Sequence, residues 1–289
     1  MRLCGNCNKP FDRASWQCPF CLHEPKRIEG HLAFAPELAE KNIGFEADYF
    51  HQLAKLERDN FWFRSRNQLI VWSLRRYFPR AESLLEIGCG TGFVLSGIKE
   101  ALPGLSLTGS EIFSAGLGFA AQRLPGVELF QMDARRIPFM EEFDVIGAFD
   151  VLEHVKEDSE VLSQMYQATR KQGGILLTVP HHPFLWSPAD DYARHVRRYK
   201  SQELKHKVKR AGFEVIRVTS FVSLLLPLLV LSRFKQRFQG KEFDPTSELR
   251  INSLMNTSLE KILDLERSLI RGGLSLPVGG SLLLIARRK

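Results

Sequence analysis

Short apolar runs alternate with amphipathic or polar stretches through most of the chain beyond residue 83. The apolar runs lie at 83–89, 106–112, 127–133, 143–150, 173–180, 213–221 and 280–289. Their length and β-prone composition are typical of buried strands. Stretches between most of them, such as 92–101, 114–124 and 156–171, have a helical pattern. The alternation predicts an α/β protein in which helices cover both faces of a mostly parallel sheet.

A further helix is predicted ahead of the first strand. Apolar residues recur three and four positions apart over 45–78, which is the period of an amphipathic helix. Its aromatic cluster Phe61–Phe63 has two interpretations. The cluster either packs against the core, as aromatic side chains usually do, or forms a lid over a ligand with Arg64 or Arg66 reaching an anionic group.

A helical, apolar insertion at about 222–278 separates the last two predicted strands. Its first part, 221–234, is apolar on all sides but shorter than the roughly 20 residues that a membrane-spanning helix needs. Its second part is an amphipathic helix for which Thr257 and Glu260 form the expected capping box. We expect the apolar part either to pack on its own domain or to make peripheral membrane contact through 221–238.

Four of the five cysteines lie near the N-terminus, in the spacing C-x2-C-x10-C-x2-C. They are Cys4, Cys7, Cys18 and Cys21. Two such pairs can offer four thiolates to one tetrahedral ion, and zinc is the natural occupant. A redox dithiol and unligated cysteines are the alternatives. We therefore predict a structural zinc ribbon at 1–25, a linker at 26–44 and a larger α/β domain at 45–289, with no open metal position for catalysis in the ribbon.

The composition of the 289-residue chain, with 44% hydrophobic and 25% charged residues, excludes wholesale disorder and a membrane bundle. The net charge of +7 is compatible with nucleic acid or anionic lipid as a partner, but acidic and basic residues are interspersed. The first ten residues lack the apolar stretch of a secretory signal. We expect a cytoplasmic protein, peripheral on the inner membrane surface if the apolar insertion contacts lipid.

The stretch LLEIGCGTG at 84–92 places Gly88, Gly90 and Gly92 directly behind a predicted strand. Glycines there allow a sharp turn and a close approach of the backbone to a ligand. A dinucleotide fingerprint would have a third glycine where this chain has Phe93, so NAD is disfavoured. A phosphate-binding P-loop is excluded because no Gly-Lys-Ser/Thr follows.

Acidic residues end the next two predicted strands. Glu111 can accept hydrogen bonds from both hydroxyls of a ribose, and Asp133, on the same edge of the sheet, from an exocyclic amine. Carboxylates around a pocket suit a ligand with a positive charge and no phosphates. The pattern therefore indicates a nucleoside whose other half carries a cation such as a sulfonium.

At 45–221 and again at 278–289 the sequence resembles the class I S-adenosylmethionine-dependent methyltransferases. LLEIGCGTG looks like their first motif, GSEI like their ribose-binding strand end, MDA like their adenine-binding strand end and FDVIGAFDVLEHV like their fourth motif. The resemblance implies an enzyme with S-adenosylmethionine as cofactor. It also implies a Rossmann-like seven-stranded sheet in the order 3-2-1-4-5-7-6, with the last strand antiparallel.

The resemblance also assigns roles to residues of these motifs. It implies that the glycine loop lies against the methionine half of the cofactor and that Asp150 lies near its amino group. We expect the cofactor-binding residues to be Glu86, Gly88, Cys89, Gly90, Gly92, Glu111, Ile112, Asp133, Ala134 and Asp150. Cys89 is expected to act as a small packing residue, because an unactivated thiol behaves as a small hydrophobe.

The methyl acceptor should enter at the carboxyl end of the fifth strand, where HHPFLWSPADDYARHVRRY follows. A hydroxyl acceptor must lose its proton, and a histidine within reach would help. Our candidates are His154, His181 and His195, although residues 195–199 could equally cap the next helix and bind the sheet edge. The segment looks like one in methyltransferases of the ubiquinone-biosynthesis type. We expect a small-molecule acceptor, lipid-like or aromatic.

Two other functions fit parts of the sequence. A zinc ribbon ahead of this fold also occurs in certain ribosomal RNA guanine methyltransferases, and the positive charge suits RNA. Against RNA, the fourth motif looks like the small-molecule branch, and basic residues do not cluster with aromatics as a single-strand track requires. An inactive interaction module is the third alternative, against which the complete set of cofactor motifs argues.

Overall fold

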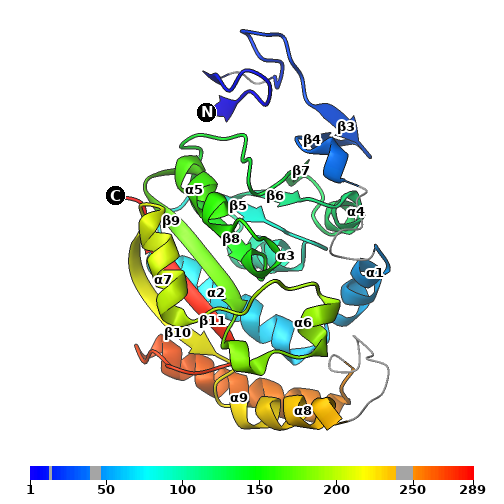
Figure 1. The fold of residues 1–289 in the computed structure, drawn as a ribbon, viewed down its shortest axis with the longest axis vertical. Coiled ribbons are helices and arrows are strands. Elements are labelled where there is room, and N and C mark those ends of the chain that lie inside the picture. The colour runs from blue at the N-terminus through cyan, green and yellow to red at the C-terminus, as the bar shows by residue number, and fades with distance from the viewer. Residues whose placement is uncertain (13–14, 40–46, 239–249) are drawn as a thin grey trace.

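The computed structural model describes residues 1–12, 15–39, 47–238 and 250–289 (Figure 1). The predicted boundary at residue 44, with the last part of the predicted linker, lies outside the described residues, as do residues 239–249 of the predicted insertion. The predicted division of the chain into domains stays a prediction.

Strands and helices follow one another as the alternation predicts. The strands are β1 (Arg2–Leu3), β2 (Pro10–Phe11), β3 (Lys26–Ile28), β4 (His31–Ala33), β5 (Ser83–Ile87), β6 (Ser106–Glu111), β7 (Glu128–Gln131), β8 (Phe143–Phe149), β9 (Thr169–Pro180), β10 (Glu214–Phe221) and β11 (Ser281–Arg287). The α-helices are α1 (Ala47–Leu56), α2 (Phe61–Tyr77), α3 (Phe93–Ala101), α4 (Ser114–Arg123), α5 (Asp158–Ala168), α6 (Pro188–Tyr192), α7 (Ser201–Arg210), α8 (Leu226–Phe238) and α9 (Ser253–Arg271). Short 3-10 helices lie at η1 (Pro36–Leu38), η2 (Leu152–His154) and η3 (Pro183–Leu185).

The main sheet runs in the order β10-β11-β9-β8-β5-β6-β7-β4-β3. From β7 to β10 this is the predicted order 3-2-1-4-5-7-6, and β11 is antiparallel to both of its neighbours. The sheet has nine strands rather than the predicted seven, because β3 and β4 extend it beyond β7. Both strands come from 26–44, predicted as a linker. They are three residues long, too short to show a period.

Helices cover both faces of the sheet, and the two faces have separate apolar cores (Figure 1). One core joins α5 and α7 to strand residues such as Leu85 and Leu177. The other joins α2, α3, α4 and α9 to residues such as Leu84 and Leu176. Successive strand residues therefore point to opposite sides, and burial on both sides explains why these strands are almost continuously apolar.

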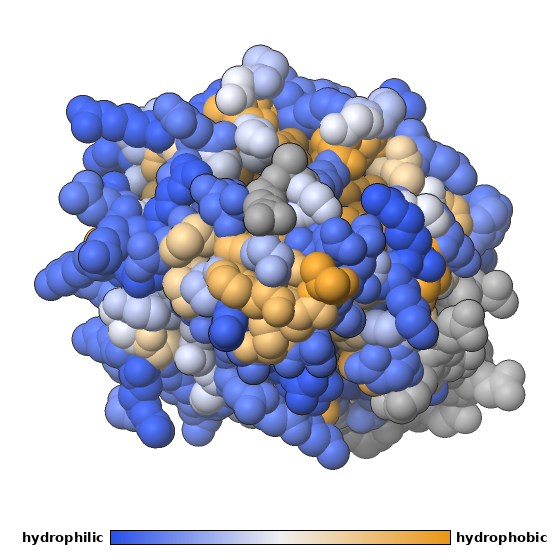
Figure 2. Space-filling model, turned by 90° about the horizontal axis from the view of Figure 1, so that it is seen from above, coloured by the Kyte–Doolittle hydropathy of each residue, from blue (hydrophilic) through white to orange (hydrophobic). Residues whose placement is uncertain are grey.

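The N-terminal segment packs on the same core as α5. Trp16 contacts Phe34, Phe130 and Phe139 with ring centroids 4.7, 5.6 and 5.5 Å apart. This segment and the α8–α9 pair lie at opposite ends of the molecule (Figure 1). Seen from the N-terminal end, a group of apolar side chains lies amid polar ones (Figure 2), and Phe20 and Leu22 of this segment are exposed.

The helix predicted over 45–78 is two helices in the structure, since residues 57–60 separate α1 from α2. The reason is local. Asn60 is extended, and its side chain accepts a hydrogen bond from the amide of Trp62 at 2.9 Å. Asparagine stabilises a helix start in this way, and the apolar period that continues through the break gives no sign of it.

The expected start of the helix in the insertion was also wrong. Helix α9 begins four residues before Thr257, where Asn252 accepts from the amide of Met255 at 2.8 Å. Thr257 lies inside the helix and donates to the carbonyl of Ser253, while Glu260 pairs with Arg64. No helix among the described residues has the length and apolar character needed to cross a membrane.

Candidate active site

A cavity of about 1400 Å³ lies at the carboxyl ends of β5, β6, β7 and β8. The segments that follow all four strands line it, as expected for ligand sites in open α/β sheets. Nine of the ten predicted cofactor residues are in its wall, namely Glu86, Gly88, Cys89, Gly90, Glu111, Ile112, Asp133, Ala134 and Asp150. The volume exceeds the roughly 300–1,000 Å³ of single-ligand pockets, so it has room for two molecules.

The glycine loop between β5 and α3 has a left-handed backbone, with φ of +66° at Gly88, +51° at Gly90 and +75° at Gly92. A Cβ on Gly88 would lie 2.5 Å from a methyl group of Val151. Gly92 is the predicted residue that lies outside the cavity wall. It ends the loop, and a Cβ there would lie 2.8 Å from the side chain of Leu124, the residue that follows α4. Its role is therefore in packing and turning.

Two buried glutamates hold this loop. The Glu111 carboxylate accepts from the amide of Gly90 at 3.0 Å and from its own neighbour Ile112 at 2.8 Å. Burial raises the pKa of Glu111, while the backbone hydrogen bonds oppose the rise. At the other side, Glu57 accepts from the Thr91 hydroxyl at 2.7 Å. Glu57 follows α1, and sequence patterns did not indicate it.

Glu86 ends β5 beneath the loop and is buried. Its Oε2 has no hydrogen-bond partner within the described parts of the chain. Burial raises the pKa of Glu86 to about 8, although the charge of Arg66 opposes the rise. A buried carboxylate oxygen without a partner is costly, and a cationic ligand group in the cavity would supply one for Oε2.

Asp150 follows β8 and has φ of +58°, a conformation that few residues other than glycine adopt. Its carboxylate forms an ion pair with Arg66 of α2 and accepts from Thr178 at 3.3 Å. The Arg66 guanidinium also lies 4.4 Å from the ring centroid of Trp62. The aromatic cluster Phe61–Phe63 thus lines the cavity, and its neighbouring arginine reaches a protein carboxylate.

Asp133, the second of the two acidic residues predicted at strand ends, also has an arginine partner. Arg135 binds the Asp133 carboxylate with two nitrogens, at 2.8 and 3.0 Å from Oδ2, and contacts Glu157 at 3.1 Å. Both Asp133 and Arg135 line the cavity. The structure therefore places Asp133 where predicted, together with a basic side chain that sequence motifs did not indicate.

Two of the three candidate histidines come together in the cavity wall. The rings of His154 and His195 meet edge to face with centroids 4.7 Å apart. His195 Nδ1 lies 2.8 Å from the Asp190 carboxylate, which also binds Arg198 at 2.8 Å. Burial alone would raise the pKa of Asp190, but His195 and Arg198 outweigh it and bring the pKa to about 2.

His154 and Glu153 belong to the 3-10 helix η2 in the fourth motif. Burial, together with the nearby His195, lowers the pKa of His154 to about 3. Glu153 was not predicted to be a site residue, yet it is fully buried and lines the cavity. Burial is the main cause that raises the pKa of Glu153, and the charge of Asp150 adds to it.

His181 is separate from this pair. Its buried ring contacts the Ser220 hydroxyl at 2.9 Å and stacks on His182, with centroids 3.6 Å apart. It follows β9 but is not among the described residues that line the cavity. Burial lowers the pKa of His181 to about 4, so the ring is neutral near pH 7. A catalytic role for His181 is therefore not proposed further.

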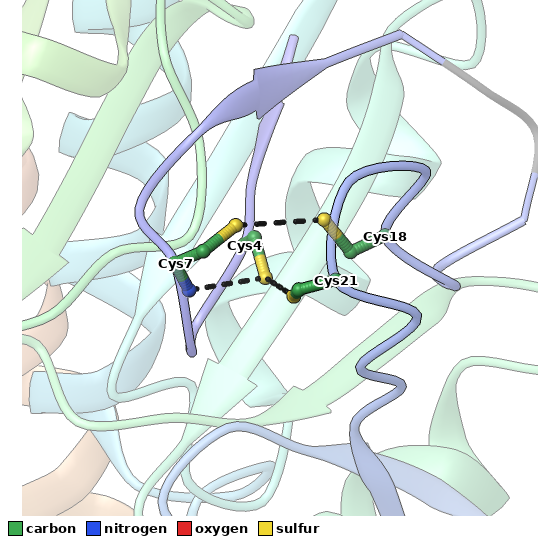
Figure 3. Close-up of side chains that lie close together, drawn as sticks. All are labelled: Cys4, Cys7, Cys18 and Cys21. Carbon is green, nitrogen blue, oxygen red and sulfur yellow. Dashed lines mark hydrogen bonds between the residues drawn. The ribbon is translucent and has the colours of Figure 1, made fainter.

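The side chains of the four N-terminal cysteines converge (Figure 3). Cys4 and Cys21 have their sulfurs 3.5 Å apart, and those of Cys7 and Cys18 are 3.7 Å apart. Tetrahedral zinc with bonds of about 2.3 Å requires sulfur separations of about 3.8 Å. The amides of Cys7 and Phe20 also donate to two of the sulfurs. The cluster has the donor set and geometry of a zinc ribbon.

Comparisons with known proteins agree with this architecture. A family model described as a methyltransferase domain matches residues 52–218. A Mycolicibacterium smegmatis protein named "Probable S-adenosylmethionine-dependent methyltransferase" is 26% identical over 55% of this chain and 62% of its own length. A ubiquinone biosynthesis O-methyltransferase of Pseudomonas putida is 29% identical over 39% of this chain and 51% of its own.

Solved structures show the same fold. Haemonchus contortus phosphoethanolamine N-methyltransferase 2, in complex with S-adenosylmethionine, has a TM-score of 0.53 and 20% identity. The match covers 77% of this chain and 52% of that one. The chain thus spans less than two thirds of this protein and of the Mycolicibacterium relative.

The sheet order, glycine loop and acidic strand ends define the class I methyltransferase architecture. The chain belongs to the methyltransferase domain family. The Mycolicibacterium relative that it resembles is named as S-adenosylmethionine-dependent.

The left-handed backbone of Gly88 predicts that a side chain at this position destabilises the protein. We expect Gly88→Ala to lower the free energy of unfolding by about 1–3 kcal/mol, because a side chain at this φ is strained and its Cβ meets Val151. Gly118→Ala is the matched control, since a Cβ on this helical glycine of α4 meets nothing within 4 Å. Alanine there should be neutral or stabilising. Urea unfolding that shows equal effects for both variants would contradict the structure.

Proposed function

We propose that the chain transfers the methyl group of S-adenosylmethionine to a small-molecule hydroxyl in the 1400 Å³ cavity. The observation that carries this proposal is the arrangement of the cavity wall. The glycine loop and the acidic strand ends form one part of the wall. His154 and His195 form another part of the wall of the same cavity. Cofactor and acceptor can then lie side by side, which methyl transfer requires.

The residues present fit the cofactor. The unpartnered Oε2 of Glu86 and the carboxylate of Asp150 suit its ammonium group, near the backbone of the glycine loop. Glu111 accepts three amide hydrogen bonds, and a carboxylate has about four acceptor positions, so one remains for a ribose hydroxyl. We assign Asp133 and its partner Arg135, which line the same cavity, to the adenine end.

The reaction needs little chemistry from side chains. The bound cofactor supplies an electrophilic methyl group on a sulfonium. In the displacement the sulfur–carbon bond breaks, its electron pair stays on sulfur, and a bond forms from the acceptor oxygen to carbon. The protein's task is to hold oxygen and methyl in line and to exclude water. The proton of the acceptor leaves through the part of the cavity that His154 and His195 line. There, Asp190 orients His195 beside His154.

We also propose that the four cysteines bind a structural zinc ion. The support is their convergence and the paired sulfur separations near those of a tetrahedral site. Elemental analysis of purified protein should find one zinc ion per chain fewer in Cys7→Ser than in the wild type, and no such loss in Cys89→Ser, whose thiol lies elsewhere in the core. Full retention in Cys7→Ser would contradict this assignment.

A lipid-like or aromatic acceptor is the substrate class we propose. Leu225, which precedes α8, lines the same cavity together with Leu229 of α8 and Leu259 of α9. The wall also continues outward, because Leu228 both lines the cavity and is exposed, and Leu231 and Phe234 of the same helix are exposed. This surface supports peripheral membrane contact through 221–238 by α8.

Cofactor binding predicts a proton release. Because the pKa of Glu86 is about 8 in the free protein, this carboxyl is mostly protonated at pH 7. A bound cation lowers that pKa, so binding should release close to one proton at pH 7 and progressively less above pH 8. Calorimetric titration with S-adenosylhomocysteine, whose amino group is also cationic, in buffers of different ionisation enthalpy measures this number.

Two variants make the titration specific. Glu86→Gln should bind with little proton release. Glu128→Gln, on the same sheet but outside the cavity wall, should behave as the wild type. Binding without any pH-dependent proton release would contradict the role of Glu86, whereas no binding at all would contradict the proposed function.

The proposed acceptor class predicts which fraction of a cell extract the protein methylates. With methyl-labelled S-adenosylmethionine and a cell extract, we expect label in the lipid-soluble fraction and none in RNA or protein. Flotation with anionic vesicles should recover wild-type protein, and Leu231→Glu should reduce binding at least tenfold, because one buried leucine contributes about 1.5–3 kcal/mol. Ile216→Glu, on β10, is the control. Label confined to RNA would favour the nucleic-acid alternative.

A further inference from the structure

Three ligating side chains converge at the polar end of the cavity. Glu153, His154 and His195 each offer one ligand atom, and these atoms all lie within 4.8 Å of one another. Three ligands that surround a shared ion evenly, with bonds of about 2.0–2.2 Å, lie about 3.5–3.8 Å apart. Side-chain shifts of about an ångström therefore suffice to close the cluster around one ion.

Glu153 is the observation that points to a missing ligand. Its side chain is completely buried, and neither carboxylate oxygen has a hydrogen-bond partner in the part of the chain that the structure describes. Buried carboxylates are otherwise paired or bound to a metal, because burying an uncompensated charge is costly. The nearby cations Arg66 and Arg198 bind Asp150 and Asp190 instead.

The two histidines are oriented as metal ligands usually are. His195 uses one ring nitrogen for the Asp190 carboxylate, and His154 makes a hydrogen bond with the backbone of Ala193. Partners of this kind fix the tautomer and the ring orientation of a ligating histidine. Asp190 is held in turn by the Ser187 amide at 2.8 Å and by Arg198, so the orientation of His195 is rigid.

We propose that Glu153, His154 and His195 bind a divalent first-row transition-metal ion in the wall of the cavity. Two imidazoles and one carboxylate suit such ions and leave coordination positions open toward the cavity. This site is separate from the four-cysteine cluster, whose donors are all thiolates.

An open position gives the ion a role that rests on the proposed function. A hydroxyl of the acceptor that binds there would be polarised and would lose its proton more readily before it attacks the methyl group. The proton then passes to solvent, and His195 serves as a ligand rather than as the base. Acceptors with two neighbouring oxygens would be favoured, since they can chelate the ion.

Binding of Mn²⁺ to the purified full-length protein tests the site. Mn²⁺ prefers oxygen and nitrogen donors, so the cysteine cluster competes little for it. Electron paramagnetic resonance should detect one Mn²⁺ site per chain, with nitrogen couplings from two histidines in pulsed spectra. Glu153→Gln and His195→Gln should each weaken binding at least tenfold, and His195→Gln should remove one nitrogen coupling. His206→Gln, an exposed histidine of α7, should leave binding unchanged.

Cofactor titration of the same variants separates loss of the site from loss of the fold. The site is supported if both variants bind S-adenosylhomocysteine as the wild type does but bind Mn²⁺ weakly. Wild-type protein that binds neither Mn²⁺ nor a second Zn²⁺, or equally tight Mn²⁺ binding in both variants, overturns it. Metal binding without cofactor binding would leave the site standing and contradict the proposed function.

Discussion

The cavity depends on one constraint, which is the left-handed backbone of the glycine loop after β5. Glycine permits this conformation, and two acidic side chains from distant parts of the chain then hold it. Glu111 accepts the amide of Gly90, and Glu57 accepts the hydroxyl of Thr91. Arg123 joins the second contact at 2.9 Å from Glu57. The loop is therefore positioned before any ligand arrives, which lowers the entropic cost of binding.

Buried acidic groups give the cavity its chemical character. Some already have partners, as Asp150 has Arg66 and Asp133 has Arg135. Glu86 and Glu153 retain oxygens without partners in the described structure. Leaving such groups unpaired costs stability that a fold would not retain without a use. The two unpaired carboxylates lie in one cavity wall, and we assign one to the ammonium of the cofactor and the other to a metal ion.

Much of this fold could be predicted from the sequence, because the strands are buried on both faces and read as short apolar runs. The same holds for the cavity residues Gly88, Glu111 and Asp150, which lie at the ends of strands or directly after them. The sequence pattern did not predict the break between α1 and α2 or the two added strands of the sheet. A local polar contact or a very short element leaves no trace in the apolar period. Asn60 caps the start of α2 after the break that follows α1, and β3 and β4 are too short to show a pattern.

The partners of the site residues could not be predicted in the same way. Arg66 reaches Asp150 across 84 positions of the chain, and Glu57 reaches Thr91 across 34. No local period encodes such contacts, since they depend on how α1 and α2 pack over the sheet. His181 shows the converse. It lies in the expected segment, but the direction of the chain after β9 points its ring toward Ser220.

The central claim is that the strand-end carboxylates and glycine loop form one cradle for S-adenosylmethionine. A crystal structure with S-adenosylhomocysteine bound tests it most directly. We predict the ammonium within hydrogen-bond distance of Glu86 or Asp150, and a ribose hydroxyl within the same distance of Glu111. A ligand bound elsewhere, or a diphosphate occupying the glycine loop in its place, would contradict the account.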